Sequence, residues 1–228
     1  MTKLAIAIDL HRCIGCNTCS IACKMQNNVP DGMLWNRVLT EGVEMFDDAV
    51  GVYPNLSRTY LPVACQHCEN PACMKVCPTG ATYKDEQGRV EIDYDRCIGC
   101  RMCMGACPYN ARVFNWNEPV RDPDFNYGDK DVPVRPKGVV EKCTRCYQKT
   151  QEGELPACVV SCGGRARWFG DMDKGWDDFR GSLDANGEPL RLTDEDYIKP
   201  FTDADVHSLP DSGNHPSDRF ILRNRVWR

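Results

Sequence analysis

The sequence predicts an α+β fold in which a small cysteine-rich unit is duplicated and carries long inserted loops and a C-terminal extension. Two observations predict it. The 228 residues contain 16 cysteines, and these fall into four runs of four. The first run and its flanking residues recur in the third run, and the second recurs in the fourth, at offsets of 84 and 85 residues. A repeat of this kind indicates stacked, similar structural units.

The third run has the spacing C-x2-C-x2-C-x3-C and is followed by Pro108. In bacterial iron–sulfur proteins, three thiolates of such a run hold one cluster and the fourth holds the neighbouring cluster. Between the second and third runs, Thr82–Lys84 and Arg89–Asp93 flank a polar turn and predict a short hairpin. Run, hairpin and run form the plan of a bacterial two-cluster ferredoxin. We therefore expect a duplicated bacterial (two-cluster) ferredoxin-like fold.

The N-terminal half contains three further predicted elements. Residues 3–10 alternate in side-chain size and predict a strand that leads into the first run. Ser20–Gln26 predicts a short helix. Residues 24–64 form a connection too long for a simple loop, which we expect to cover a cluster or contact a partner. Arg58–Ala64 predicts a strand that leads into the second run.

The C-terminal half is less regular. Ala111–Trp116 and Ala166–Phe169 predict strands, the second ending in a turn at Gly170–Asp171, and residues 117–138 predict an irregular loop. Thr193–Asp196 predicts the cap of a short helix that ends at Ile198. The last ten residues combine basic and apolar side chains. We interpret them as a tail docked on a partner, with a disordered tail as the alternative.

The gaps between the runs predict which runs share clusters. The gap from Cys77 to Cys97 is the length of a hairpin, whereas the other two gaps are longer, so the second and third runs pair and the first and fourth pair. The three-plus-one rule then gives cluster A (Cys13, Cys16, Cys19 and Cys162), cluster B (Cys143, Cys146, Cys158 and Cys23), cluster C (Cys65, Cys68, Cys73 and Cys107) and cluster D (Cys97, Cys100, Cys103 and Cys77). Every cysteine is used once, which favours four cubane clusters.

This pairing also predicts the domain organisation. Residues 1–64 and 109–172 form an outer ferredoxin-like unit with clusters A and B. Residues 65–108 form an inner unit with clusters C and D. Residues 173–228 form an extension that includes the docking tail.

Two other uses of the cysteines are weaker interpretations. Disulfides are typical of cysteine-rich secreted chains, but runs this close would require cramped bridges between near neighbours. Structural zinc sites also use C-x2-C pairs, but they have no use for the third and fourth cysteine of each run.

Charge and hydropathy exclude other classes of protein. The net charge of −5 makes nucleic acid an unexpected partner. No window approaches the 18 or so apolar residues of a membrane span, and the N-terminus lacks a secretion signal and a twin-arginine pair. We expect a cytoplasmic location by default, or export together with a catalytic partner that carries a twin-arginine signal.

The chain resembles the iron–sulfur electron-transfer (beta) subunits of the dimethyl sulfoxide reductase family of molybdopterin oxidoreductases. The resemblance covers residues 3–172 and rests on the four runs and on Gln66–Cys73, Pro156–Cys158 and Arg165–Asp171. Some relatives replace one ligand, but here every ligand position is Cys, so the resemblance implies four 4Fe–4S clusters. Gly163 stands where many relatives have Pro, which affects the local turn alone. Asn27–Trp35 is similar to arsenate-reductase and dehydroxylase-like members.

The resemblance implies a non-catalytic subunit that relays single electrons to or from a large catalytic subunit with a molybdopterin guanine dinucleotide cofactor holding Mo or W. That partner would be an anaerobic reductase or dehydrogenase, and a membrane anchor or quinol-reactive subunit is a further partner the resemblance allows. The alternatives are a free-standing polyferredoxin and a relay subunit of a hydrogenase-type complex.

Several side chains beside the ligands have candidate roles. Lys24, Arg101, Lys142 and Arg145 are placed to offset cluster charge. For His67 we favour structural packing over a hydrogen bond to a cluster or a role as metal ligand. Packing is also the favoured role of Trp35, Trp116 and Trp168.

Overall fold

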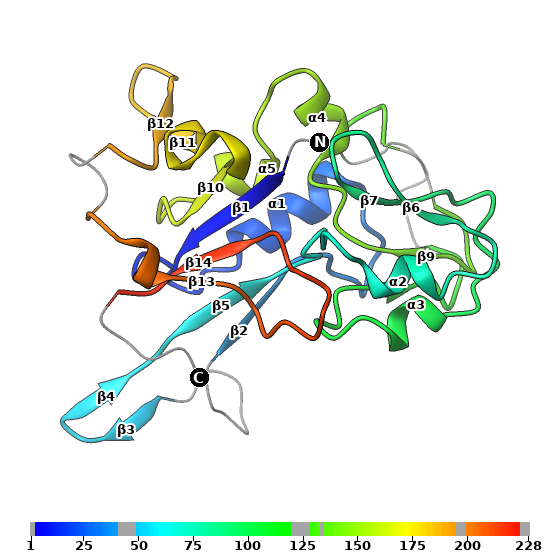
Figure 1. Cartoon of the computed structure of the whole chain (residues 1–228), viewed down its shortest axis with the longest axis horizontal. Helices are drawn as coiled ribbons and strands as arrows, with labels where there is room; N and C mark the ends of the chain where they lie inside the picture. The colour runs from blue at the N-terminus through cyan, green and yellow to red at the C-terminus, as the bar shows by residue number, and fades with distance from the viewer. Residues whose placement is uncertain (1–2, 41–48, 120–127, 133–134, 195–198, 224–228) are drawn as a thin grey trace.

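The computed structural model describes residues 3–40, 49–119, 128–132, 135–194 and 199–223 (Figure 1). Its strands are β1 (Leu4–Asp9), β2 (Arg37–Thr40), β3 (Val50–Val52), β4 (Asn55–Ser57), β5 (Tyr60–Val63), β6 (Thr82–Lys84), β7 (Val90–Ile92), β8 (Val113–Phe114), β9 (Val140–Glu141), β10 (Arg167–Asp171), β11 (Arg180–Leu183), β12 (Pro189–Arg191), β13 (Val206–His207) and β14 (Arg219–Ile221). Its α-helices are α1 (Thr18–Gln26), α2 (Ala72–Lys75), α3 (Met102–Gly105), α4 (Tyr147–Gln151) and α5 (Ala157–Val160). Short 3-10 helices are η1 (Met172–Lys174), η2 (Trp176–Asp178) and η3 (Asp203–Asp205). The chain is therefore a mixed α and β protein.

The largest sheet has six strands in the order β12-β11-β10-β1-β14-β13. Its central strand, β1, is apolar on both faces. Ile6 and Ile8 pack into the core that contains the buried cysteines, while Ala5 and Ala7 pack with Trp168 on the opposite face. Because successive side chains of a strand point to opposite faces, the alternation of large and small residues in β1 serves two cores at once.

The β6–β7 hairpin and the β1–β10 pair have the same geometry. Both are antiparallel, and they form equivalent pairs under the sequence repeat: Ile8 lies opposite Arg167, and Ile92 lies opposite Thr82. The amide of Asp9 donates to the carbonyl oxygen of Ala166 at 2.8 Å, and the amide of Asp93 donates to that of Ala81, also at 2.8 Å. The predicted hairpin between the second and third runs is confirmed.

The loops that follow these strands also match. Gly15 and Gly99 have φ angles of 69° and 67°, and Asn17 and Arg101, which precede α1 and α3, have 60° and 63°. The left-handed region turns the chain sharply. The two loops therefore turn in the same way between equivalent cysteines.

Figure 1 shows that the two strand pairs lie in different parts of the molecule. The six-stranded sheet with α1 and α5 forms one part. The β6–β7 hairpin, α2 and α3 form the other. The β3–β4 hairpin projects away from both, and Val52 at the end of β3 and Tyr53 in the turn are exposed.

Several elements differ from the sequence-based expectations. The strand expected at Ala166–Phe169 is β10, which continues through Gly170 and Asp171, where a turn is expected. It continues because Gly170 pairs with Ala5 of β1. The helix α4, which lies between Cys146 and Cys158, was not expected, and the strand expected at 111–116 is reduced to β8. The expected helix up to Ile198 lies largely outside the described residues. The first strand, the helix at 20–26 and the strand before the second run are confirmed as β1, α1 and β5.

The end of the chain is placed differently from the expected docking tail. β14 pairs in parallel with β1, and Phe220, Ile221 and Leu222 are buried in this chain's own cores. β1 offers a free edge beside β10, and the apolar residues of the tail fill it. Docking on a partner is therefore wrong for these three residues, as is disorder; residues 224–228 lie outside the described part.

This placement makes a prediction for stability. Phe220 is fully buried, so Phe220→Ala should lower the free energy of unfolding by about 3–5 kcal/mol, the usual cost of truncating a buried aromatic residue. Leu183→Ala, at a residue that is 43% exposed, is the control and should change it by less than about 0.5 kcal/mol. Urea unfolding under anaerobic conditions measures both, and equal effects would contradict the burial of β14.

Among the described residues, none of the helices has the length and apolarity that crossing a membrane requires.

Candidate iron–sulfur sites

All sixteen cysteines lie in the described residues, and all are free thiols. The disulfide interpretation is therefore wrong for this structure. Nor does any group of three or more His, Cys, Asp or Glu side chains in the described ranges approach closely enough to hold a single metal ion. A cubane separates the sulfurs it ligates, so the thiols are considered below as sets.

The predicted ligands of cluster A come from the two ends of the cysteine pattern. Burial raises the pKa of the Cys13 thiol, and charges on Cys19 and Cys162 raise it further. Cys162 accepts a hydrogen bond from the amide of Ala166 at 3.3 Å. Cys16 is exposed, and the hydroxyl of Thr18 at 3.3 Å lowers its pKa. The fold thus brings the first run beside the last cysteine, with Cys16 at the surface.

The predicted ligands of cluster B surround Cys23 on α1. Burial raises the pKa of Cys23 well above its ordinary value, and charges on Cys143, Cys146 and Cys158 raise it further. The side-chain amide of Asn27 lies 3.7 Å from the sulfur of Cys23 and 3.6 Å from that of Cys146. The fourth cysteine of the first run is therefore gathered with the first three of the last run.

The predicted ligands of cluster C show the same three-plus-one arrangement. Burial raises the pKa of Cys68 to about 12, with further contributions from Cys65, Cys73 and Cys107. Four thiolates held this close repel one another. A bound cluster supplies the positive iron that relieves this repulsion, so these residues fit the group.

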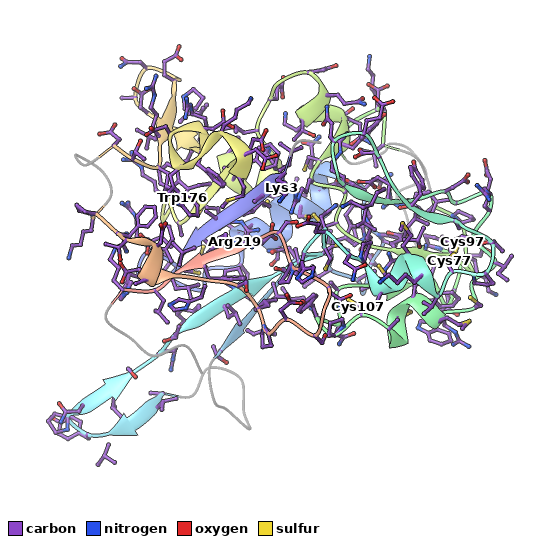
Figure 2. The ribbon with its side chains drawn as sticks, viewed as in Figure 1. Lys3, Cys77, Cys97, Cys107, Trp176 and Arg219 are labelled. Atoms are coloured by element: carbon purple, nitrogen blue, oxygen red, sulfur yellow. The ribbon has the colours of Figure 1, made fainter. Side chains whose placement is uncertain are left out.

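The four predicted ligands of cluster D line one cavity together with Arg112 and Thr82. Burial acts to raise the pKa of Cys77, but hydrogen bonds from the backbone of Thr82 and the hydroxyl of Thr79 outweigh it, so the pKa falls to about 7. Figure 2 shows Cys77 and Cys97 together near α2 and α3, with Cys107 of the neighbouring set closer to the centre. The cavity and its donors suit a cluster held by thiolates.

Close cysteines also connect the sets to one another. Cys158 of set B interacts with Cys19 of set A. Cys143 of set B interacts with Cys65 of set C, and Cys103 of set D interacts with Cys73 of set C. The sets therefore follow one another in the order A, B, C, D. Cys16 in set A and Cys100 in set D are the two exposed cysteines, one in each terminal set.

The cations expected beside the ligands behave differently from one another. Lys142 is buried between sets B and C. Lys24 instead donates to the carbonyl oxygens of Val29, Pro30 and Met33. Arg145 pairs with Asp218 at 2.8 Å. Arg101 stacks on the ring of Trp116 at 4.4 Å.

The aromatic residues and His67 mostly serve in packing, as expected. Trp35 and Trp168 are buried, and Trp116, which is 61% exposed, packs at the surface against the ring of Phe114, with 4.7 Å between the ring centroids. The ring Nδ1 of His67 accepts from the amide of Val90 at 3.0 Å. Burial, with the charges of Arg145, Lys142 and Arg89, lowers the pKa of His67 well below its usual range, so His67 is a neutral packed side chain.

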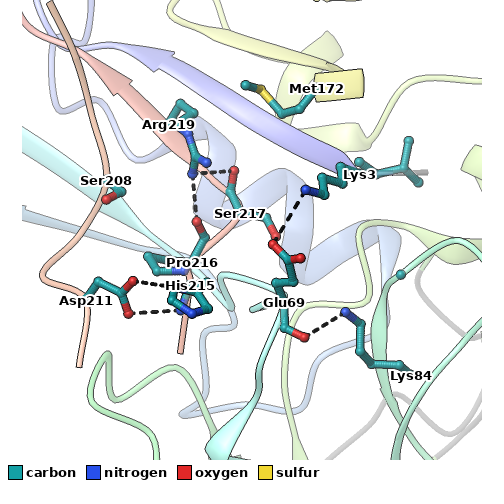
Figure 3. Close-up of a pocket in the computed structure, with 12 residues that line it drawn as sticks. Lys3, Glu69, Lys84, Met172, Ser208, Asp211, His215, Pro216, Ser217 and Arg219 are labelled. Atoms are coloured by element: carbon teal, nitrogen blue, oxygen red, sulfur yellow. Dashed lines mark hydrogen bonds and ion pairs between the residues drawn. The ribbon is translucent and has the colours of Figure 1, made fainter. Parts of the chain in front are cut away.

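The C-terminal extension contributes directly to the ligand loops, which the sequence pattern did not indicate. A pocket bordered by Lys3, Glu69, Asp211 and Arg219 marks the contact (Figure 3). The amide of Glu69 donates to the carbonyl oxygen of His215 at 2.9 Å, and Lys3 pairs with Glu69 at 3.7 Å. The segment at 211–217 thus braces the loop that carries Cys68.

Comparison with known proteins decides what binds here. The 4Fe-4S dicluster domain family matches residues 56–122 and 131–172, and the 4Fe-4S binding domain family matches residues 10–26. A Halobacterium salinarum protein, named as an iron–sulfur subunit of dimethyl sulfoxide reductase, is 50% identical; the alignment covers 97% of this chain and 79% of that protein. A subunit of the Escherichia coli anaerobic dimethyl sulfoxide reductase is 39% identical, over 76% of each sequence.

This protein belongs to the family of iron–sulfur subunits of dimethyl sulfoxide reductase-type enzymes. Other members that it resembles include the arsenate respiratory reductase iron–sulfur subunit of Shewanella sp., at 37% identity over 75% of this chain and 82% of the relative. As an iron–sulfur subunit of this family, it is a non-catalytic electron-transfer subunit that binds four 4Fe–4S clusters. The zinc interpretation is not supported.

Proposed function

We propose that this iron–sulfur subunit relays single electrons along the row A, B, C, D, to or from a large catalytic subunit that carries a molybdopterin cofactor with Mo or W. The observation that supports the proposal is the row itself. Each set of four thiols lies next to the following set, and the two terminal sets each include an exposed cysteine, Cys16 or Cys100. A row with two open ends suits entry of electrons at one end and exit at the other.

The proposal includes the assignment of ligands and the domain organisation. The pairing of Cys23 with the fourth run and of Cys68 with Cys107 supports the three-plus-one sets predicted from the sequence. The shared register of β1–β10 and β6–β7 supports a duplicated ferredoxin-like fold, with an outer unit of residues 1–64 and 109–172 and an inner unit of residues 65–108. In the extension, β11–β14 add to the six-stranded sheet and residues 211–217 contact the loop of the second run, which supports residues 173–228 as a separate extension.

The partner and compartment are also part of the proposal. The relatives at 50% and 39% identity are named as subunits of dimethyl sulfoxide reductases, which supports an anaerobic reductase or dehydrogenase as the complex. The subunit works in the compartment of its catalytic partner, cytoplasmic or exported with it. A membrane-anchored, quinol-reactive subunit is the proposed electron exchange partner at the end opposite to the catalytic subunit.

Isolation of the chain from its native source tests the proposal. We expect a large companion protein that contains Mo or W, and about sixteen iron atoms for each copy of this chain, four per cluster. Mass spectrometry and metal analysis of the same fraction measure both. A fraction with about sixteen iron atoms but no companion and no Mo or W would contradict the subunit proposal and favour a free polyferredoxin.

A further inference from the structure

Buried cationic side chains lie among the thiols, and three of those in the described part of the chain lie where two neighbouring sets meet. They are Arg167, Lys142 and Arg112, which are 2%, 1% and 3% exposed. A buried charge is costly unless an opposite charge or good hydrogen bonds compensate it. The groups around each cation therefore show which negative charges compensate it.

Arg112 lies between sets C and D. Its guanidinium donates to the sulfur of Cys73 at 3.0 Å and to the hydroxyl of Thr82 at 3.2 Å. It also borders the cavity lined by the four cysteines of set D. Burial acts to lower the pKa of Arg112, but the negative charges of Cys73, Cys103 and Cys65 outweigh it and raise the pKa. One guanidinium thus faces thiolates of both sets.

Lys142 lies between sets B and C. Its ammonium donates to the carbonyl oxygen of Cys143 at 2.9 Å and lies 3.6 Å from a carboxylate oxygen of Glu91. Burial raises the pKa of Cys65 in set C and of Cys143 in set B, and the positive charge of Lys142 acts to lower both pKa values. The Glu91 carboxylate is the neighbouring group that offsets part of this charge.

Arg167 lies between sets A and B. Its guanidinium donates to the side-chain oxygen of Asn36 at 3.3 Å, and the amide of Asn36 donates to the sulfur of Cys19 at 3.1 Å. The charges of Cys158, Cys19 and Cys162 surround it and, against the effect of burial, raise its pKa. Its Nε is buried without an acceptor in the described part of the chain, as is expected of a donor whose acceptor arrives with a bound cluster.

The position of a cation between two clusters has a specific electrostatic effect. Each transfer oxidises one cluster and reduces its neighbour by one electron, so the electron balance closes within the row. Reduction takes a cluster with its four thiolates from a net dianion to a trianion, and a nearby cation stabilises the more negative form. A cation close to two clusters raises the reduction potentials of both. It therefore favours reduction of both clusters without creating a large difference between their potentials.

We propose that Arg167, Lys142 and Arg112 each tune two neighbouring clusters at once, A with B, B with C, and C with D. This inference rests on the cluster row of the proposed function. It goes beyond the charge-offsetting role expected of Lys142 from the sequence, because it adds Arg167 and Arg112 and assigns two clusters to each cation.

The test uses the complete complex, purified anaerobically, with potentiometric titration followed by EPR spectroscopy. Cysteine variants that each remove one cluster assign the signals. Arg112→Gln should lower the reduction potentials of clusters C and D and leave those of A and B unchanged. At a fixed solution potential, the ratio of reduced to oxidised cluster should fall at least tenfold, which corresponds to 59 mV for one electron. Lys142→Gln should lower the potentials of clusters B and C, and Arg167→Gln should lower the potentials of clusters A and B.

Two further variants decide the result if a glutamine variant loses iron. Glu91→Gln removes the carboxylate beside Lys142 and keeps its shape, so it should raise the potentials of clusters B and C. Arg112→Lys keeps the charge and should retain the potentials of clusters C and D. Unchanged potentials in Glu91→Gln would overturn the proposal even if no glutamine variant were stable.

The matched control removes a buried ion pair instead of a cation shared by clusters. Arg89 is also buried, and its guanidinium lies 2.7 Å from Asp85. The double variant Arg89→Gln/Asp85→Asn removes no net charge and should leave all four potentials unchanged. The proposal is overturned if the three glutamine variants each shift a single cluster, none, or all four equally. A failure of the cluster row itself is distinguished because it would change the iron content or the number of EPR signals in the unaltered complex.

Discussion

Replacing both Cys23 and Cys143 with alanine is expected to remove one cluster, not two. The iron content should fall from about sixteen to about twelve atoms per chain, since four iron atoms belong to each cluster. The reason is the position of Cys23. It lies on α1 as the fourth cysteine of the first run, but its sulfur is gathered with those of Cys143, Cys146 and Cys158.

Iron analysis and EPR spectroscopy of the double variant measure this. Cys23→Ala and Cys143→Ala alone should each alter the same EPR signal, and the double variant should alter no further signal. The control is Cys13→Ala/Cys23→Ala, which should alter two signals, because Cys13 lies with Cys19 and Cys162. If Cys23→Ala/Cys143→Ala alters two signals and Cys13→Ala/Cys23→Ala alters one, each run holds its own cluster and the three-plus-one assignment is wrong.

The second large effect is expected at Gly99, in the loop that carries the ligands of cluster D. A methyl group there would lie 2.1 Å from the carbonyl oxygen of Gly138, and the φ angle is +67°. Backbone cannot move aside as a side chain can. The backbone strain and the overpacking of Gly99→Ala together should cost roughly 2–6 kcal/mol and remove cluster D before the other clusters.

Two matched glycines make this prediction specific. Gly15 is the equivalent residue in the first run, but there a methyl group would meet the ring of Tyr60, a side chain that can turn. Gly15→Ala should therefore be milder. Gly105 has nothing within 4 Å and ends α3, so Gly105→Ala should retain all four clusters. The rate at which a chelator removes iron, followed by absorbance, ranks the three variants. Equal rates of iron loss in Gly99→Ala and Gly105→Ala would contradict the close approach of Gly138.

Local sequence features were sufficient for the elements next to the cysteine runs. The polar turn between Thr82–Lys84 and Arg89–Asp93 is a local signal that predicts the β6–β7 hairpin. The apolar alternation in residues 3–10 likewise predicts β1. These elements were predicted correctly because each has a local sequence signature, although β1 forms its ladder hydrogen bonds with the distant strands β10 and β14.

Elements that depend on distant partners were predicted less well. Phe220 and Ile221 have the composition of a docking surface, but β1 lies about two hundred residues earlier and provides the edge on which they pack. The strand ending at Asp171 is longer than expected for the same reason, since pairing with β1 extends it. A sequence pattern shows that a segment needs an apolar partner and does not show which surface supplies it.

The kind of protein could be read from the order of residues alone, because cluster ligands are recognised by their spacing: four runs, an internal repeat and a cysteine at every ligand position. The surroundings of the thiols, in contrast, are known from the fold. Arg112 reaches Cys73 from 39 residues away, and Ser217 donates to the carbonyl oxygen of His67 from 150 residues away. Buried charges and bracing loops act through space, so their roles follow from the folded distances and have no signature in the order of residues.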